Sequence, residues 1–168
     1  MTTLYLVRHG ETVDNANQIM QGQTQGELNE NGIKQAREFS DEWKDKPIDV
    51  VVASDLKRSI DTALIIAEPH KLEVLTTPLL RERDWGSFTG RYILELKGET
   101  WPDDIESLED LLSRAGEFIA YVKQTFPGKK VLAVGHGIIN KAIQSFYYQK
   151  TMNEIQRMSN AEVRILEL

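Results

Sequence analysis

The stretch Leu4-Tyr5-Leu6-Val7-Arg8-His9-Gly10-Glu11-Thr12 joins a short apolar run to a polar cluster. Four consecutive residues with apolar or strand-forming side chains predict a strand that is buried on both faces of a sheet. The run ends abruptly at Arg8-His9-Gly10. The sequence therefore predicts a guanidinium and an imidazole at the carboxyl end of the first strand.

Two further apolar runs end in the same way. Ile48 to Ala53 precedes Arg58, and Val131 to Val134 precedes Gly135-His136-Gly137. Buried strands that alternate with helices predict an α/β fold, here a three-layer α/β/α sandwich with a mostly parallel central sheet and helices on both faces. Ligands of such folds bind beyond the carboxyl ends of the strands, so we expect the three polar ends to form one site.

The segments between the runs carry helix signals. Asn29 and Ser107 are candidate N-caps of amphipathic helices. Another helix is expected to begin at Ser54-Asp55. Its apolar face would consist of Ile60, Ala63, Leu64 and Ala67. Glu162 to Leu166 alternates polar and apolar residues, which suits a strand near a sheet edge.

Composition excludes several classes of protein. The 168 residues fit one domain, 1–168, and a net charge of −6 argues against nucleic acid or an anionic membrane as the main partner. The absence of cysteine excludes thiol catalysis, and three histidines without metal-ligand spacing predict no metal site. The chain has neither a membrane-length apolar run nor a signal-peptide pattern, so we expect it in the cytoplasm.

The polar strand ends have the chemistry of phosphoryl transfer. A phosphate monoester is a dianion, and Arg8 and Arg58 would supply bidentate donors. Arg58 would also lie at a helix N-terminus, where backbone amides favour an anion. Neighbouring arginines disfavour a protonated imidazole, so His9 is expected to be a neutral nucleophile and His136 a donor to a phosphate oxygen. The leaving alkoxide needs a proton, for which Glu82 is the candidate acid. No cofactor is required.

Several motifs, in order, resemble those of the histidine phosphatase superfamily in its phosphoglycerate-mutase-like branch. They lie within Leu6–Thr12, Leu28–Gly32, Ala53–Thr62, Leu80–Gly90, Val134–Gly137 and Asn160–Val163. The resemblance covers essentially the whole chain. It implies a phosphoglycerate-mutase-like fold in a single domain with a short cap insertion at about 91–106.

The resemblance also implies roles for individual residues. His9 would become phosphorylated, Arg8, Arg58 and His136 would complete the phosphate pocket, and Glu82 would donate the proton. Arg83 follows the acid and would hold an anionic, carboxylate-bearing substrate. The residues assigned to the substrate are Asn15, Gln21, Gly22, Arg83 and Gly137.

Alternative interpretations of single residues stay open. Glu82 lies in a charged run that is typical of a solvated loop, although Gly86 and Gly90 follow it at the spacing of the motif. Asn15 could cap a turn, and Trp85 could line the pocket or belong to the core.

A phosphohistidine can react with water or return its phosphoryl group to a bound acid. The second fate needs a cationic cap that excludes water, but segment 91–106 has only Arg91 and Lys97 against five acidic residues. We therefore predict a phosphatase for a small phosphate monoester. The alternatives are a cofactor-dependent phosphoglycerate mutase, a phosphohistidine protein phosphatase and a non-catalytic phosphate-ligand binder. The substrate and the oligomeric state stay open.

Overall fold

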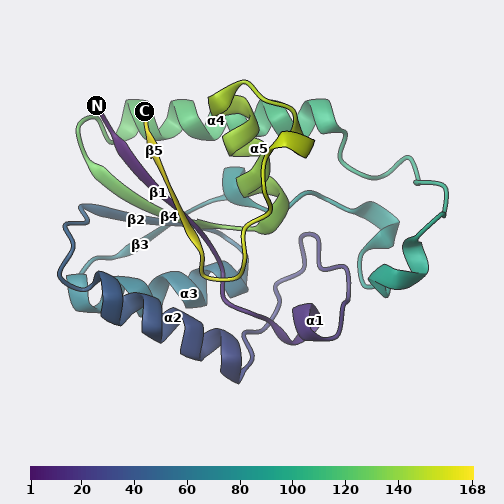
Figure 1. Cartoon of the computed structure of the whole chain (residues 1–168), viewed down its shortest axis with the longest axis horizontal. Coiled ribbons are helices and arrows are strands. Elements are labelled where there is room, and N and C mark those ends of the chain that lie inside the picture. The colour runs from purple at the N-terminus through teal and green to yellow at the C-terminus, as the bar shows by residue number, and fades with distance from the viewer.

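A five-stranded sheet forms the centre of the molecule in a computed structural model that describes residues 1–168 (Figure 1). The strand order is β3-β2-β4-β1-β5. Three of the four strand pairings are parallel, and β5 runs antiparallel to β1 at the edge. The strands are β1 (Thr3–Arg8), β2 (Val50–Ser54), β3 (Val74–Thr77), β4 (Lys130–Gly135) and β5 (Val163–Glu167).

Helices cover both faces of this sheet, as the sequence predicted. α2 and α3 lie on one face, and α4 and α5 lie on the other (Figure 1). The helices are α1 (Val13–Ala16), α2 (Glu30–Trp43), α3 (Lys57–Ala67), α4 (Leu108–Thr125) and α5 (Gly137–Tyr148). No helix has both the length and the apolar character needed to cross a membrane.

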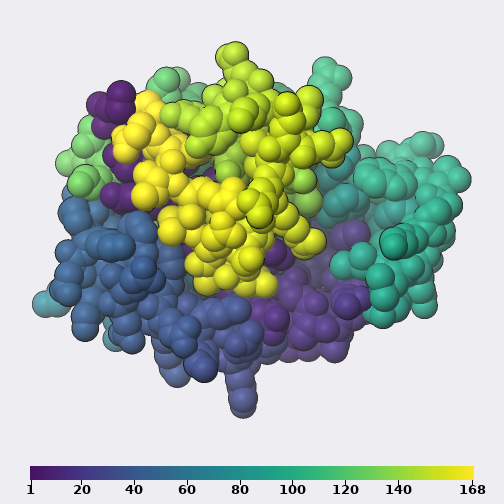
Figure 2. All heavy atoms as spheres, in the orientation of Figure 1, coloured from purple at the N-terminus to yellow at the C-terminus, as the bar shows by residue number.

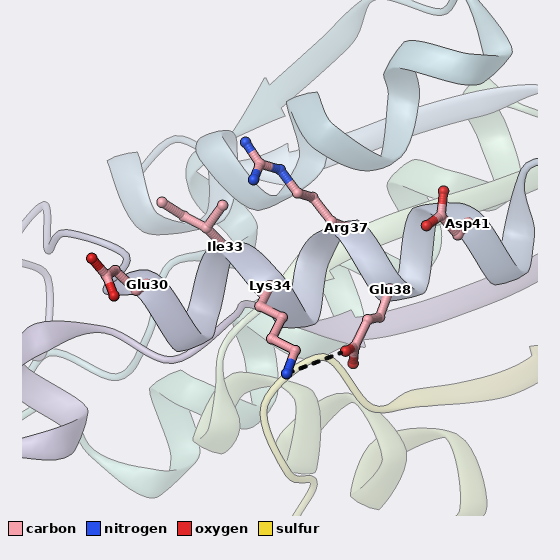
Figure 3. Close-up of a pocket in the computed structure, with 6 residues that line it drawn as sticks. All are labelled: Glu30, Ile33, Lys34, Arg37, Glu38 and Asp41. Carbon is pink, nitrogen blue, oxygen red and sulfur yellow. Dashed lines mark ion pairs between the residues drawn. The ribbon is translucent and has the colours of Figure 1, made fainter.

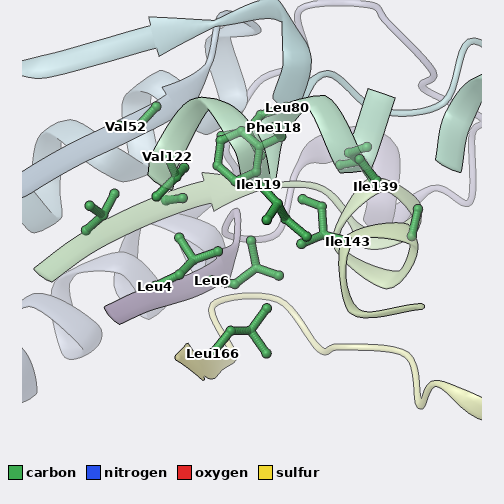
Figure 4. Packing of buried hydrophobic residues seen from close by; sticks show 14 of the residues in the cluster. Leu4, Leu6, Val52, Leu80, Phe118, Ile119, Val122, Ile139, Ile143 and Leu166 are labelled. Carbon is green, nitrogen blue, oxygen red and sulfur yellow. The ribbon is translucent and has the colours of Figure 1, made fainter. Parts of the chain in front are cut away.

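The core has two parts, one on each face of the sheet. The larger part lies under α4 and α5, where Phe118 and Ile143 meet Leu4 and Leu6 of β1 (Figure 4). On the other face, Trp43 of α2 stacks on Phe39 and meets the ring of Tyr5 edge-on. Complete burial of a large apolar side chain contributes about 1.5–3 kcal/mol, so both helix layers are held mainly by these contacts.

The predicted helix starts are correct for two helices and wrong for the third. Asn29 Oδ1 accepts from Gly32 N at 2.8 Å, and Ser107 Oγ accepts from Asp110 N at 3.0 Å. However, α3 begins at Lys57 and not at Ser54, because Ser54 still belongs to β2. Leu64, expected on the apolar face of α3, is 53% exposed.

Segment 91–106 lies against the loop that follows α1. Met20 N donates to Arg91 O, and Ile93 N donates to Gln18 O, each at 2.8 Å. Figure 2 shows this teal segment projecting from the side of the molecule beside the purple N-terminal loop. The two segments together form one wall of the cavity described below.

Candidate active site

His9 lies at the carboxyl end of β1 and is 2% exposed. Its Nδ1 is 2.7 Å from the carbonyl oxygen of Gly10. A carbonyl only accepts hydrogen bonds, so Nδ1 carries the proton and the lone pair of Nε2 is free. Asn160 Nδ2 donates to the His9 carbonyl at 3.0 Å and holds this end of the strand in place.

The surroundings of His9 favour the neutral imidazole. Burial is the main reason that the pKa of His9 lies well below its usual value, and the charges of Arg58 and Arg8 lower it further. The sequence predicted a neutral imidazole because of the arginines, but burial contributes more. A neutral imidazole with a free Nε2 is a competent nucleophile.

Arg58 lies in the first turn of α3 and is 1% exposed. Its Nη2 donates to Gly22 O at 2.7 Å, its Nη1 donates to Thr24 O, and its Nε has no partner in the protein. Burial lowers the pKa of Arg58 to about 10, against the opposing charge of Glu82. The side chain is therefore still a cation at neutral pH.

Arg8 approaches the same site from β1. Its Nη1 donates to Met158 O at 2.8 Å, and its Nε has no protein partner. A Cβ atom on Gly137 would lie 3.4 Å from that Nε. The glycine at the start of α5 therefore lets the guanidinium come close to the helix.

His136 precedes α5 and is fully buried. Its ring centroid is 5.1 Å from that of His9. Its Nε2 is 2.9 Å from Ser54 Oγ and 3.1 Å from Ser59 Oγ, whereas Nδ1 has no partner. If both hydroxyls donate to Nε2, the proton of the neutral ring is on Nδ1, which is then a free donor.

The start of α3 does not offer its amides to an anion, contrary to the prediction. Gln25 Oε1 accepts from Lys57 N at 2.9 Å, and Gln25 O accepts from Arg58 N at 3.1 Å. A loop residue thus satisfies the first donors of the helix. At this end of the cavity, positive charge comes from the guanidinium of Arg58.

Glu82 binds the N-terminus of α5. Its Oε1 accepts from the amides of Arg83 and Ile139, both at 2.9 Å, and its Oε2 accepts from Ile138 N at 3.0 Å. The carboxyl group also lines the cavity next to His9. Glu82 is therefore held in a defined place and is not a freely solvated loop residue.

A cavity of about 190 Å³ connects these side chains. It is lined by Arg8, His9, Asn15, Ile19, Met20, Gln21, Gly22, Arg58, Glu82, Trp85, Ile93, Ile138 and Arg157. Most predicted site residues thus share one cavity, with His136 behind His9. Sequence reasoning missed Ile19, Met20, Ile93, Ile138 and Arg157. No motif marked them, because they come together only through the loop after α1, the cap, the first turn of α5 and the segment before β5.

The predicted substrate residues of the N-terminal loop also shape the loop itself. Asn15 Oδ1 accepts from Thr12 N at 3.1 Å, within a capping box of α1. Gln21 Oε1 accepts from Thr12 Oγ1 at 2.9 Å, and the Gly22 carbonyl binds Arg58. Asn15 therefore caps a turn and lines the cavity at once, which reconciles the two interpretations of this residue.

Arg83 does not line the cavity. Its Nε donates to Glu106 O at 2.8 Å, and its guanidinium lies 5.0 Å from the ring centroid of Trp85 and 5.3 Å from that of Trp101. The cation thus lies against two aromatic rings, which contact each other edge-on with centroids 5.4 Å apart. Arg157 is the cation that lines the cavity in addition to Arg8 and Arg58.

A separate depression lies on the surface of α2 and shares no residue with this cavity (Figure 3). It is lined by Glu30, Ile33, Lys34, Arg37, Glu38 and Asp41. Lys34 and Glu38 form an exposed ion pair at 3.9 Å, and pairs of this kind contribute little free energy. The depression is a solvated helix face without a group suited to phosphoryl transfer.

A histidine with a free Nε2, two buried arginines and a carboxyl group at the carboxyl edge of a parallel sheet define an α/β enzyme of the phosphoryl-transfer class. The family model of the histidine phosphatase superfamily (branch 1) matches residues 4–168. The chain belongs to this superfamily.

Known relatives include phosphatases and proteins named as phosphoglycerate mutases. A probable phosphoglycerate mutase GpmB of Enterobacter sp. is 35% identical over 153 residues, covering 82% of this chain and 71% of that protein. The chain is 43% identical over 141 residues to the uncharacterized phosphatase PhoE of Bacillus subtilis, covering 82% of this chain and 72% of that protein. It is 34% identical over 187 residues to a metal-independent phosphoserine phosphatase of Arabidopsis thaliana, covering 100% and 77%. A mycobacterial glucosyl-3-phosphoglycerate phosphatase with VO3 has a TM-score of 0.91 at 26% identity, covering 98% and 92%. The chain is a phosphatase of this superfamily.

Proposed function

We propose that this phosphatase hydrolyses small phosphate monoesters through a phosphohistidine on Nε2 of His9. The observation that carries the proposal is a set of three buried nitrogens without a protein partner, Arg8 Nε, Arg58 Nε and His136 Nδ1. Buried polar groups in proteins are nearly always hydrogen-bonded. The non-bridging oxygens of a phosphoryl group beside His9 would accept from all three.

The proposed reaction has two steps. Nε2 of His9 attacks phosphorus, the ester P–O bond breaks, and protonated Glu82 transfers its proton to the leaving oxygen. Water then attacks the phosphohistidine, the N–P bond breaks, and Glu82 takes a proton from that water. Inorganic phosphate leaves, and His9 and Glu82 return to their starting states.

The cap supports hydrolysis over return of the phosphoryl group to an acid. Of its two cations, Arg91 is paired with Glu99, with N–O distances of 2.8 and 3.2 Å. Within the cap, Lys97 is then the one cation left that could help to retain a second phosphate group. In this proposal residues 1–168 form one domain with a short cap at about 91–106.

The cavity supports a small substrate. Its volume of about 190 Å³ is below the roughly 300 Å³ at which drug-sized sites begin. Two of the relatives are named for phosphoserine and glucosyl-3-phosphoglycerate, which are phosphate esters of hydroxy acids. We extend that substrate class to this chain.

The test is turnover of p-nitrophenyl phosphate, phosphoserine and 3-phosphoglycerate, in EDTA, by the wild type and by His9→Ala. We expect the wild type to release phosphate and to be inhibited by vanadate, and the variant to lose activity by at least about 10³-fold. Circular dichroism controls for folding. Labelled substrate should leave an acid-labile phosphoenzyme only in the wild type.

Retained turnover by His9→Ala would contradict the proposal. So would interconversion of 3- and 2-phosphoglycerate, on addition of 2,3-bisphosphoglycerate, without release of phosphate. That outcome would instead identify a mutase.

A further inference from the structure

Arg114 of α4 binds the backbone of the segment that carries Glu82. Its Nη1 donates to the carbonyls of Leu79 at 3.0 Å and Arg81 at 2.6 Å, and its Nη2 donates to the Glu82 carbonyl at 3.4 Å. Residues 79–82 follow β3 and belong to no strand. The guanidinium thus binds backbone carbonyls of a segment that no strand pairing holds in place.

Arg114 is itself fixed by Glu106, at the end of the cap. Its Nε and Nη2 pair with the Glu106 carboxylate at 3.0 and 2.8 Å, and the two side chains are only 17% and 13% exposed. Glu106 Oε1 also accepts from Asp84 N at 3.0 Å. All five N–H donors of the guanidinium are therefore engaged, two of them toward the carboxylate that ties it to the cap.

We propose that Arg114 and Glu106 form a clamp that positions Glu82 for transfer of its proton to the leaving group. This inference rests on the proposed function. The clamp holds the main chain of Glu82 from α4, while Ile138 N and Ile139 N hold its carboxyl group from α5. α4 and α5 pack together across the larger core, so both anchors belong to one packed helix layer.

The geometry explains why the proton transfer depends on this clamp. A general acid has to lie within about 2.6–3.2 Å of the atom that it protonates. A displacement of about 1 Å, caused by a distant mutation, can cost roughly 10²-fold in rate. Loss of the guanidinium removes a donor from three backbone carbonyls around the acid, of which the Glu82 carbonyl keeps Gln23 Nε2 at 3.2 Å. It also leaves the Glu106 carboxylate without its cation and with the amide of Asp84 as a donor.

Two substrates separate positioning from stability. p-Nitrophenolate leaves as a stable anion with little need for a proton, whereas the alkoxide of glycerol 3-phosphate needs one. For Arg114→Gln and Arg114→Lys, we expect kcat/KM for glycerol 3-phosphate to fall about 10–100-fold more than for p-nitrophenyl phosphate. Unfolding lowers the active fraction for both substrates equally, so it cancels in this ratio.

Arg91→Gln is the matched control. It breaks the bidentate pair Arg91–Glu99 of the cap, which lies on the exposed surface. The ratio of kcat/KM for the two substrates should therefore stay within about twofold of the wild-type ratio. Glu82→Gln is the benchmark and should shift the ratio in the same direction as Arg114→Gln and further. Glu106→Gln, which keeps the side-chain size, should give a smaller shift and replaces Arg114→Gln if that variant does not fold.

If Arg114→Gln lowers kcat/KM equally for both substrates while Glu82→Gln lowers it selectively for glycerol 3-phosphate, the clamp is contradicted. The role of Glu82 as the acid is then retained. An unselective Glu82→Gln would overturn the role of Glu82 as acid and the clamp with it. If turnover still depends on His9, the proposed phosphohistidine step is retained even where the roles of Glu82 and of the clamp are rejected.

Discussion

At the scale of single residues, each histidine of the site has one ring nitrogen fixed by the protein and one left over. His9 Nδ1 is bonded to Gly10 O, and His136 Nε2 lies between two serine hydroxyls. The fixed nitrogen of each ring decides what the other one can do. The first ring presents a lone pair, and the second presents a proton when the two serine hydroxyls donate to its Nε2, which would match a nucleophile and an oxyanion donor.

Arg157 leads to a prediction about the substrate. It lines the cavity and is exposed. Burial is the main reason that the pKa of Arg8 is lowered, and the charge of Arg157 lowers it further. If Arg8 and Arg58 bind the phosphoryl group as proposed, Arg157 is the cation that remains for a carboxylate. We expect Arg157→Gln to lower kcat/KM for 3-phosphoglycerate by about 10-fold or more, since a hydrogen bond to a charged group contributes about 1.5–3 kcal/mol.

Glycerol 3-phosphate is the matched substrate, because it differs from 3-phosphoglycerate only in a hydroxymethyl group in place of the carboxylate. Its kcat/KM should change by less than about twofold. Lys97→Gln, a charge-removing change in the cap, controls for the general loss of positive potential. Equal losses on both substrates would assign Arg157 to the phosphate group. No loss on either would identify it as a solvated surface residue.

At the scale of elements, the close approach of β1 and α2 places His9. Gly10 follows the strand and Gly32 lies in the first turn of α2. A Cβ on Gly10 would lie 2.5 Å from Gly32 O, and a Cβ on Gly32 would be closer still to Glu11 O. Both obstacles are backbone atoms, which cannot move aside without shifting the whole element.

Gly32→Ala should therefore destabilise the fold by about 1–3 kcal/mol, the usual cost of overpacking, and lower kcat by moving His9. Urea denaturation and turnover of p-nitrophenyl phosphate measure the two effects. An unchanged free energy of unfolding would contradict the close approach.

Gly116→Ala is the control for Gly32→Ala. Gly116 is also a helical glycine, but its Cβ would meet the ring of Phe146 at 2.7 Å, and that side chain is 50% exposed and able to turn away. Replacing glycine by alanine within a helix gains up to about 1 kcal/mol. The control should be neutral or more stable, with full activity.

At the scale of the whole molecule, the buried histidines make stability depend on pH. Burial holds the pKa of His9 and of His136 well below the usual value, mainly by desolvation. Below a pH of about 6.5 the unfolded chain therefore binds protons that the folded chain does not. The free energy of unfolding should fall as the pH falls from about 6.5 toward the lower folded pKa values, by up to about 1.4 kcal/mol per pH unit for each histidine.

Urea denaturation between about pH 7 and pH 5 tests this prediction. The slope should be roughly halved in His9→Gln or His136→Gln. Asp55 and Glu162 do not interfere, because the folded state lowers their pKa values. Their contribution to stability is present at pH values above their unfolded pKa values, and it is lost only at pH values below the tested interval. A flat profile in the wild type would contradict the burial of the two imidazoles.

The sequence by itself determined the α/β architecture. Strand and helix signals act between residues a few positions apart, as in the run Leu4–Val7 and the cap at Asn29, so they can be read along the chain. The motifs around His9, Arg58 and His136 were placed correctly at the carboxyl ends of their strands, because parallel strands bring those ends to one edge.

Only the tertiary structure decided which groups face the cavity and what each one is bonded to. Gln25 occupies the amides that were expected to bind an anion, Arg83 is stacked away from the cavity, and Arg157 takes a place on its wall. Arg114 reaches Glu82 across 32 positions of the chain. Contacts of this kind depend on side-chain packing between segments that are distant in sequence, so the local periodicity of the sequence does not predict them.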